Sequence, residues 1–169
     1  GPKGIIITRA AILITVLLLI LWRLKRQEVS FYISFVYVFF VYLEALRYTG
    51  ERPVLFTILF TPLTFIILEG FKENKRKVLF ILLPLMLLWA NLHGGFIIGN
   101  IIIAVYMFCE GLKIIFKKVS YNGHNILTFY TATTMALLIS YINPTGWDAF
   151  FIAFSPTYKV FEAGIQEYQ

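Results

Sequence analysis

Six apolar runs follow one another along the chain, and each ends at charged residues, glycine, proline or asparagine. A membrane interior about 30 Å thick needs about 17–25 helical residues to cross it. Most of the runs approach that length, and none shows the polar face that a helix of a soluble bundle carries. The pattern therefore predicts membrane-spanning helices at roughly 5–22, 30–46, 54–69, 78–92, 96–116 and 126–142.

The third and fourth runs are short, and each contains a proline, Pro62 or Pro84. Prolines are tolerated in spanning helices where neighbouring groups satisfy the carbonyl that loses its partner. Residues 78–116 are too long for one straight span, which predicts a tight break at Asn91–Gly95. We therefore expect an all-α polytopic transmembrane bundle of about six spans, a single domain over 1–169, with an outer-face interfacial segment at 143–169.

Composition excludes several other classes of protein. Hydrophobic residues make up 59% of the chain and charged residues 14%, against roughly 45–50% and 25% in soluble domains. The only cysteine, Cys109, excludes a disulfide scaffold. The chain has two histidines and one cysteine, so no metal site is predicted, neither for zinc nor for haem iron. No other cofactor is evident. A nucleic-acid partner is not expected either, because the net charge of +6 is better explained by membrane topology.

The basic residues are distributed unevenly between alternate loops. Ten of the 15 lysines and arginines fall in the first, third and fifth loops between the predicted spans. The positive-inside rule places those loops in the cytoplasm and both termini outside. The basic clusters are best explained as topology signals that contact anionic lipid. Residues suited to chemistry then face outward, in the second loop, the Asn91–Gly95 break and the segment after Asn143.

The segment Trp89–Phe96 is the most unusual one in the sequence. Polar groups at membrane depth are functional candidates by default, and His93 and Asn91 lie there. Gly94 and Gly95 permit a close backbone approach, and the next helix start would offer N–H groups to a phosphate. His93 is the candidate to orient or protonate such an anion. The alternative is a plain helix–helix turn that contains one hydrogen-bonded histidine.

A charged cluster closes the second run. Arginine side chains bind phosphate through paired N–H donors, which makes Arg47 and Arg52 candidate substrate-binding residues. A carboxylate here, Glu44 or Glu51, is a candidate general base. The alternative is a network of salt bridges at the membrane surface. The aromatic-rich second run itself is best explained by packing or lipid contact, with a groove for an isoprenoid tail as an alternative.

Polar residues near the end of the chain complete the candidate set. Asn143 opens a turn of Asn, Pro, Thr and Gly, and Trp147 is a membrane-interface anchor. The segment that follows suits a surface position or a cover over a cavity between spans. Among the acidic residues of this segment, Glu167 is a candidate for substrate binding. The simpler alternative is that its side chain is solvated.

Four strings in fixed order carry a family resemblance: Arg52-Pro53, Trp89-Ala-Asn-Leu-His-Gly-Gly-Phe96, Asn143-Pro-Thr-Gly-Trp147 and Gly164-Ile-Gln-Glu-Tyr-Gln169. From about Gly4 to Gln169, the chain resembles a largely uncharacterised family of multi-spanning bacterial membrane proteins. That family is similar to the C-type glycosyltransferases, which depend on polyprenyl-phosphate sugars. Carried over by position, the strings mark Arg52, Asn91, His93, Asn143 and Glu167 as site candidates.

The resemblance implies an enzyme of the bacterial inner membrane that takes sugar from a lipid phosphate at the outer face. Such enzymes share an acidic residue in their first outer loop, which serves as base or metal ligand, and this chain has no matching motif. The chain is therefore expected to be a piece of a longer protein and inactive alone, and a divalent metal stays an alternative for the full length. A non-enzymatic helical subunit of a membrane complex is the first alternative function, and a transporter or flippase is the second.

Overall fold

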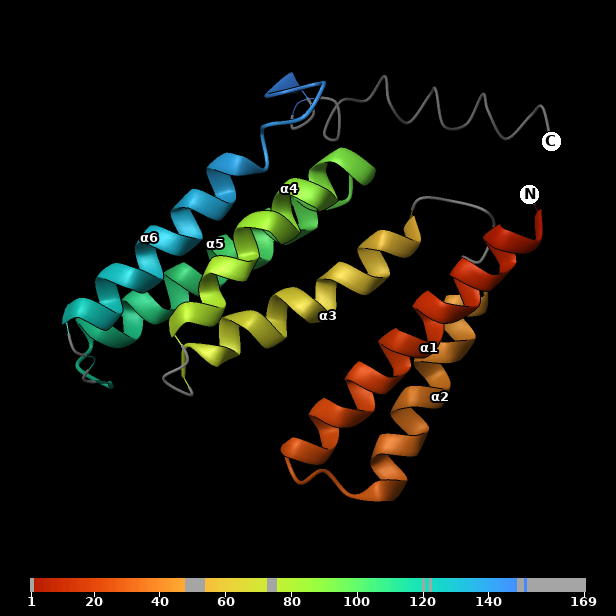
Figure 1. The fold of residues 1–169 in the computed structure, drawn as a ribbon. Coiled ribbons are helices and arrows are strands. Elements are labelled where there is room, and N and C mark those ends of the chain that lie inside the picture. Colours follow the sequence, from red (N-terminus) through yellow and green to blue (C-terminus); the bar gives the residue numbers. More distant parts are fainter. Residues whose placement is uncertain are drawn as a thin grey trace.

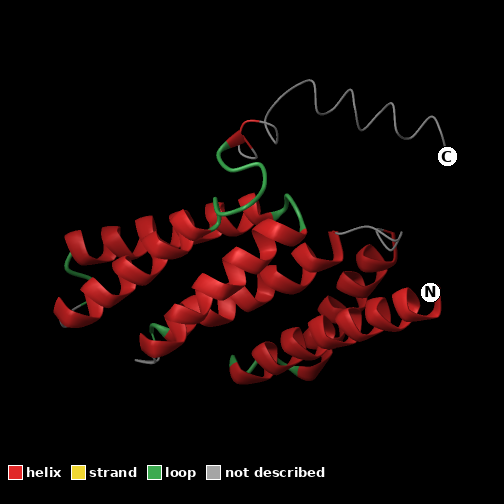
Figure 2. Ribbon diagram, turned by 45° about the horizontal axis from the view of Figure 1, so that its top comes forward, coloured by secondary structure: helices red, strands yellow, loops and turns green. Residues whose placement is uncertain are grey.

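The computed structural model describes residues 2–47, 54–72, 76–119, 121, 123–148 and 151, without the side chains of residues 2, 5, 44–47 and 76. Within this part the chain forms helices joined by loops and contains no strand (Figure 2). The elements are α1 (Pro2–Arg26), α2 (Phe31–Arg47), α3 (Val54–Gly70), the 3₁₀ helix η1 (Arg76–Ile81), α4 (Leu82–Leu92), α5 (Phe96–Ile115) and α6 (Gly123–Ile139).

The all-helical prediction is confirmed, and the helices differ from the predicted runs in a few particulars. The fourth run is divided into η1 and α4, with Pro84 in the first turn of α4. Because Pro84 has no N–H group, it gives the carbonyl of Phe80 no α-helical partner, and the residues before it wind more tightly. The sixth helix lies three residues earlier than predicted, at Gly123–Ile139.

Helix α3 lies between two groups of helices (Figure 1). Helix α1 packs on one side of α3 and α2 packs against α1, whereas α4, α5 and η1 pack on the other side of α3. Helix α6 contacts α4, α5 and η1. Consecutive helices run in alternate directions, so the loops lie at two opposite ends of the molecule (Figure 1).

Among the described residues, the hydrophobic core is formed by α3, η1, α4, α5 and α6, and Val16 of α1 is buried outside this cluster. Trp89, Phe96 and Phe129 are its largest fully buried side chains. Helix α2 instead exposes large apolar side chains, with Phe31 76% and Tyr32 81% exposed. In water so much exposed apolar surface is unfavourable, which indicates that another apolar medium covers α2.

Two helices are long and apolar enough to cross a membrane by length and composition, namely Ile6–Arg26 and Phe96–Ile115. Shorter apolar helices occupy Phe31–Leu43, Val54–Gly70 and Lys77–Leu92. In the described part of the chain, two of the six predicted spans therefore have the length that a membrane-crossing helix needs.

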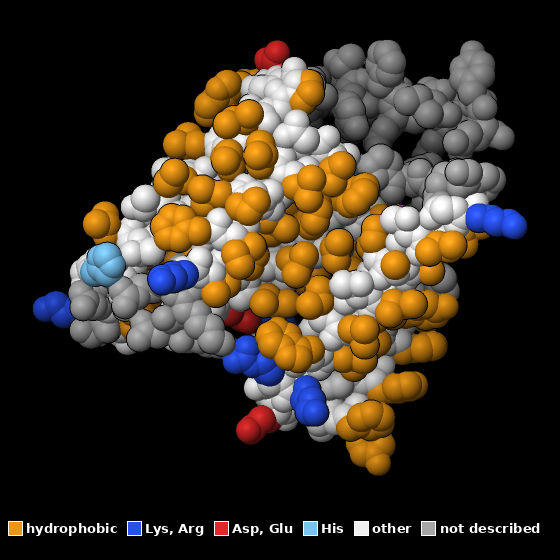
Figure 3. Space-filling view, viewed as in Figure 1, with side chains coloured by type: hydrophobic (Ala, Val, Ile, Leu, Met, Phe, Trp, Pro, Cys, Tyr) orange, Lys and Arg blue, Asp and Glu red, His pale blue; other side chains and the backbone are white. Residues whose placement is uncertain are grey.

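The basic loops meet at one end of the bundle, which we call the basic end. Arg23 near the end of α1 pairs with Glu69 near the end of α3, with 2.5 Å between Nη2 and Oε1. Phe71 after α3 packs against Tyr121 before α6, with ring centroids 4.8 Å apart. Most lysines and arginines visible in Figure 3 lie toward this end, and hydrophobic side chains cover the face above them. The opposite end contains the connection between α4 and α5.

Candidate functional site

The connection between α4 and α5, residues Asn91–Gly95, forms a sharp elbow, as the sequence predicts. His93 caps α4 in an extended conformation, with φ −160° and ψ 139°, and its N–H donates to the Trp89 carbonyl at 2.9 Å. Gly94 and Gly95 complete the turn, and α5 begins at Phe96. The elbow thus reverses the chain direction within a few residues.

The first N–H groups of α5 are already hydrogen-bonded. Phe96, Ile97 and Ile98 donate to carbonyls three residues earlier, at distances of 3.3, 3.4 and 3.0 Å. These N–H groups were expected to face a phosphate, so the structure gives the helix start less anion-binding capacity than the sequence indicates. At the elbow, the side chains therefore offer a ligand better hydrogen-bonding groups than the N–H groups at the start of α5 do.

Gly95 allows the elbow to press against the first turns of α3. A β-carbon at Gly95 would overlap the Thr57 hydroxyl and lie 2.9 Å from Cδ2 of His93. Thr57 also accepts a hydrogen bond from Nε1 of Trp89 at 3.2 Å. Trp89, His93 and Gly95 of the elbow region therefore converge on Thr57, near the start of α3.

Replacing Gly95 by alanine is expected to lower the free energy of unfolding by about 1–3 kcal/mol, because the added methyl group must displace Thr57. Gly94 provides the matched control, since a β-carbon there meets nothing within 4 Å. Gly94→Ala should leave stability within about 0.5 kcal/mol of wild type. Thermal unfolding in detergent would measure both, and equal stability of the two variants would contradict the close approach.

The His93 imidazole lies half-buried beside this contact. Burial lowers its pKa below the usual value, so the ring is neutral at pH 7. Within the described residues the ring makes no hydrogen bond. A neutral imidazole offers one donor and one acceptor, which suits it to donate to a phosphate oxygen or to accept a proton.

The two asparagines of the predicted site are used to build the structure. Nδ2 of Asn91 donates to the carbonyls of Leu87 and Ile142, at 2.8 and 2.9 Å. The Asn143 side chain donates to the Ser140 carbonyl and accepts from the backbone and side chain of Thr145. Asn91 therefore ties the segment after α6 to α4, and both amides are engaged in holding turns.

A groove of about 580 Å³ runs between α1, α2 and α3. Thr57 lines the groove on the side of the elbow, and Arg23 and Gln27 line it toward the basic end. Between them the walls are mostly apolar, with Val16, Leu19, Ile20, Tyr37, Pro62 and Phe65 among them. Because Thr57 also touches the elbow, the groove and the elbow share a wall.

The remaining predicted site residues are placed only in part. Glu44 and Arg47 belong to the last turn of α2, and their side chains are outside the described residues. Glu51, Arg52 and Glu167 also lie outside the described residues. In the described part no group of three or more His, Cys, Asp or Glu residues is arranged to hold a metal ion.

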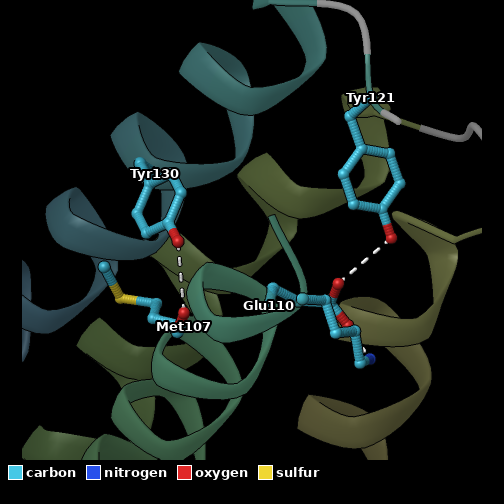
Figure 4. Close-up of polar contacts among 5 residues, drawn as sticks. Met107, Glu110, Tyr121 and Tyr130 are labelled. Carbon is cyan, nitrogen blue, oxygen red and sulfur yellow. Dashed lines mark hydrogen bonds and ion pairs between the residues drawn. The ribbon is translucent and has the colours of Figure 1, made fainter. Parts of the chain in front are cut away.

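Sequence reasoning missed a buried polar cluster near the basic end (Figure 4). Glu110 is 1% exposed, and its carboxylate accepts from Lys113 Nζ at 2.6 Å and from the Tyr121 hydroxyl at 3.0 Å. Burial, this hydrogen bond and the negative charge of Glu110 raise the pKa of Tyr121 to about 12. The spacing of Glu110 and Lys113, three residues apart on one helix, was the signal available in the sequence.

Thr57 was also missed, because a threonine in an apolar run is ordinary in spanning helices. Its importance appears only when the elbow and α3 are seen together. The elbow, Thr57 and the groove together form the candidate site. No family model matches the chain, and no curated protein or solved structure matches it either.

Proposed function

We propose that this chain is part of an integral membrane glycosyltransferase-like enzyme that uses a lipid-phosphate-linked sugar at the outer face. The observation that carries the proposal is the shared wall of the elbow and the groove at Thr57. A polar turn at the end of an apolar groove suits a ligand with a phosphate head and a long hydrocarbon tail. The exposed apolar surface of α2 and the two full-length apolar helices support a membrane location.

In this proposal the tail lies in the groove and the phosphate lies beside His93. The neutral imidazole donates a hydrogen bond to the leaving lipid phosphate, which stabilises the charge that develops on it. Arg47 or Arg52 adds positive charge to the same phosphate. Such an arrangement lowers the barrier for breaking the bond between the sugar and the phosphate.

The reaction balances without a redox partner. The hydroxyl oxygen of the acceptor forms a bond to the anomeric carbon, and the bond from that carbon to the phosphate oxygen breaks. The hydroxyl proton passes to a carboxylate, Glu44 or Glu51 when that base belongs to this chain. The lipid phosphate leaves with the electron pair.

The test is sugar transfer from a polyprenyl-phosphate donor by the full-length protein. His93→Ala is expected to lower kcat/KM about 100-fold, as removal of a positioned donor does, and Arg52→Ala to raise KM. His124→Ala is the matched control, since His124 lies in the first turn of α6, at the basic end. Wild-type activity in both His93→Ala and Arg52→Ala would overturn the proposal.

One observation favours a second candidate, a non-enzymatic helical subunit of a membrane complex. The side-chain amides of Asn91 and Asn143 are engaged in holding turns, as expected if the polar strings only shape the fold. This candidate predicts that purification of the full-length protein brings down stable membrane partners. It also predicts that His93→Ala changes neither glycan synthesis nor complex formation.

A further inference from the structure

Helix α3 brings two polar groups to the wall of the apolar groove. Ile58, Thr61 and Pro62 all line the groove. Pro62 lies inside α3 and has no N–H group, so the carbonyl of Ile58 has no α-helical partner. Among the described residues, no side chain donates to this carbonyl either. The groove wall therefore contains a hydrogen-bond acceptor that lacks its usual partner.

Thr61 supplies a hydrogen-bond donor within one turn of this carbonyl. A threonine hydroxyl in a helix can donate to the carbonyl four residues earlier, as those of Thr15 and Thr64 do at 2.7 and 2.8 Å. The partly buried Thr61 makes no such bond, and its hydroxyl has no other hydrogen-bond partner among the described residues. We call the Thr61 hydroxyl and the Ile58 carbonyl the polar notch.

The polar notch indicates what kind of ligand the groove binds best. A plain hydrocarbon chain would cover both groups without satisfying them, which costs free energy. A ligand hydroxyl satisfies both, because it accepts from Thr61 and donates to the Ile58 carbonyl. The rest of the groove wall is mostly apolar. The combination suits an amphiphile with one hydroxyl near its head and one hydrocarbon chain.

The distance from the elbow to the notch narrows the choice of ligand. Thr61 follows Thr57 by four residues, which is about 6 Å along the axis of α3. A phosphate beside His93, at the level of Thr57, therefore needs a ligand hydroxyl roughly 6 Å away. In a lysophospholipid, four bonds separate phosphorus from the oxygen of the free glycerol hydroxyl. At about 1.25 Å of advance per bond, this span is about 5 Å.

We propose that the groove binds a lysophospholipid, a glycerol phosphate lipid with one acyl chain and a free hydroxyl on the central carbon. The hydroxyl occupies the polar notch, and the acyl chain follows the apolar wall past Phe65 toward the basic end. The inference rests on the phosphate position beside His93 in the proposed function. Such a lipid occupies the groove in place of the sugar donor and so limits donor binding.

The test is a competition between two lipids that differ by one oxygen atom. Lysophosphatidic acid and its analogue without the central hydroxyl are offered in equal amounts to the full chain in neutral detergent. Native mass spectrometry measures the ratio of the two bound lipids. Wild type should prefer lysophosphatidic acid about 10-fold. Thr61→Val removes the hydroxyl at nearly constant shape and should reduce the preference to less than about two-fold. This variant also reports any unequal partition of the two lipids into micelles.

The same helix offers a matched control and a second variant. Thr64→Val should keep the preference, because Thr64 is fully buried outside the groove lining and donates to the Phe60 carbonyl. Pro62→Ala provides an N–H group that gives the Ile58 carbonyl its helical partner. The preference should then fall at least about three-fold although Thr61 is unchanged. Thermal unfolding of each variant shows whether the fold is retained.

Two outcomes would overturn this inference. Equal binding of the two lipids by wild type would mean that no ligand hydroxyl occupies the notch. An undiminished preference in Thr61→Val would mean that the hydroxyl is recognised elsewhere. Farnesyl phosphate, measured in the same way, separates the inference from the proposed function. If it binds while the two lysolipids bind equally, only the notch assignment fails. If none of the three lipids binds, the phosphate position fails, and the proposed function fails with it.

Discussion

Replacing Trp89 by alanine is expected to lower the free energy of unfolding by about 3–5 kcal/mol, the cost of removing a large aromatic side chain from a packed core. Trp89 is fully buried. Its ring packs against Phe60 with centroids 5.6 Å apart, and a β-carbon at Gly99 would lie 2.7 Å from its Cζ3. The loss combines the buried ring surface with the cavity that its removal leaves between α3, α4 and α5.

Two further variants separate packing from hydrogen bonding. Trp89→Phe keeps most of the ring and loses the donor to Thr57, so it should cost about 1–2 kcal/mol. Trp147→Ala is the control, since Trp147 is 62% exposed and should cost less than about 1.5 kcal/mol, the value of its ring contact with Tyr141. Denaturant unfolding in detergent micelles measures all three. Equal losses for Trp89→Ala and Trp147→Ala would show that the α3–α4–α5 core is not tightly packed.

Trp89 also shows which part of the candidate site the sequence could predict. The break at Asn91–Gly95 follows from local rules, since two glycines interrupt an apolar stretch too long for one span. The partner of the break, Thr57, lies 32 residues from Trp89 in sequence. No local pattern distinguishes it from Thr61 or Thr64 on the same helix. Only the packing of α3 against α4 and the elbow selects it.

The topology was predictable for a similar reason. Helices of about membrane length, joined by short loops, must alternate in direction, so the basic loops were expected at one end. The basic end follows this prediction, as the Arg23–Glu69 pair between α1 and α3 shows. The pocket between α1, α3 and η1 at this end was not predicted. Its existence depends on the separation of α1 from α3, which is set by side-chain packing and cannot be read from composition.

The expected free helix start at α5 was wrong for a physical reason. A helix that begins with a tight turn can satisfy its first N–H groups through bonds to carbonyls three residues back. Phe96, Ile97 and Ile98 do this. Sequence reasoning locates the helix start but does not tell whether the first turn is open or closed. For this reason the site proposed above relies on the His93 side chain.

The Glu110–Lys113 pair should respond unequally to removal of its two members. Among the described residues, Lys113→Met leaves the buried Glu110 carboxylate with the Tyr121 hydroxyl as its remaining partner, which should cost about 2–3 kcal/mol of unfolding free energy. Glu110→Leu removes the buried charge itself. Lys113 is 37% exposed and Glu110 1% exposed, so the released ammonium group reaches solvent, and this variant should cost about 1 kcal/mol.

The double variant, Glu110→Leu with Lys113→Met, gives the decisive comparison. It should be more stable than Lys113→Met alone, because no unpaired charge is left inside the bundle. The cycle of four proteins then yields a coupling free energy of about 1–2 kcal/mol, measured by unfolding at pH 7 and low salt. If Lys113→Met proves no less stable than Glu110→Leu, the carboxylate has another partner besides Lys113 and Tyr121. The buried ion pair would then not be what fixes the end of α5 against the segment that precedes α6.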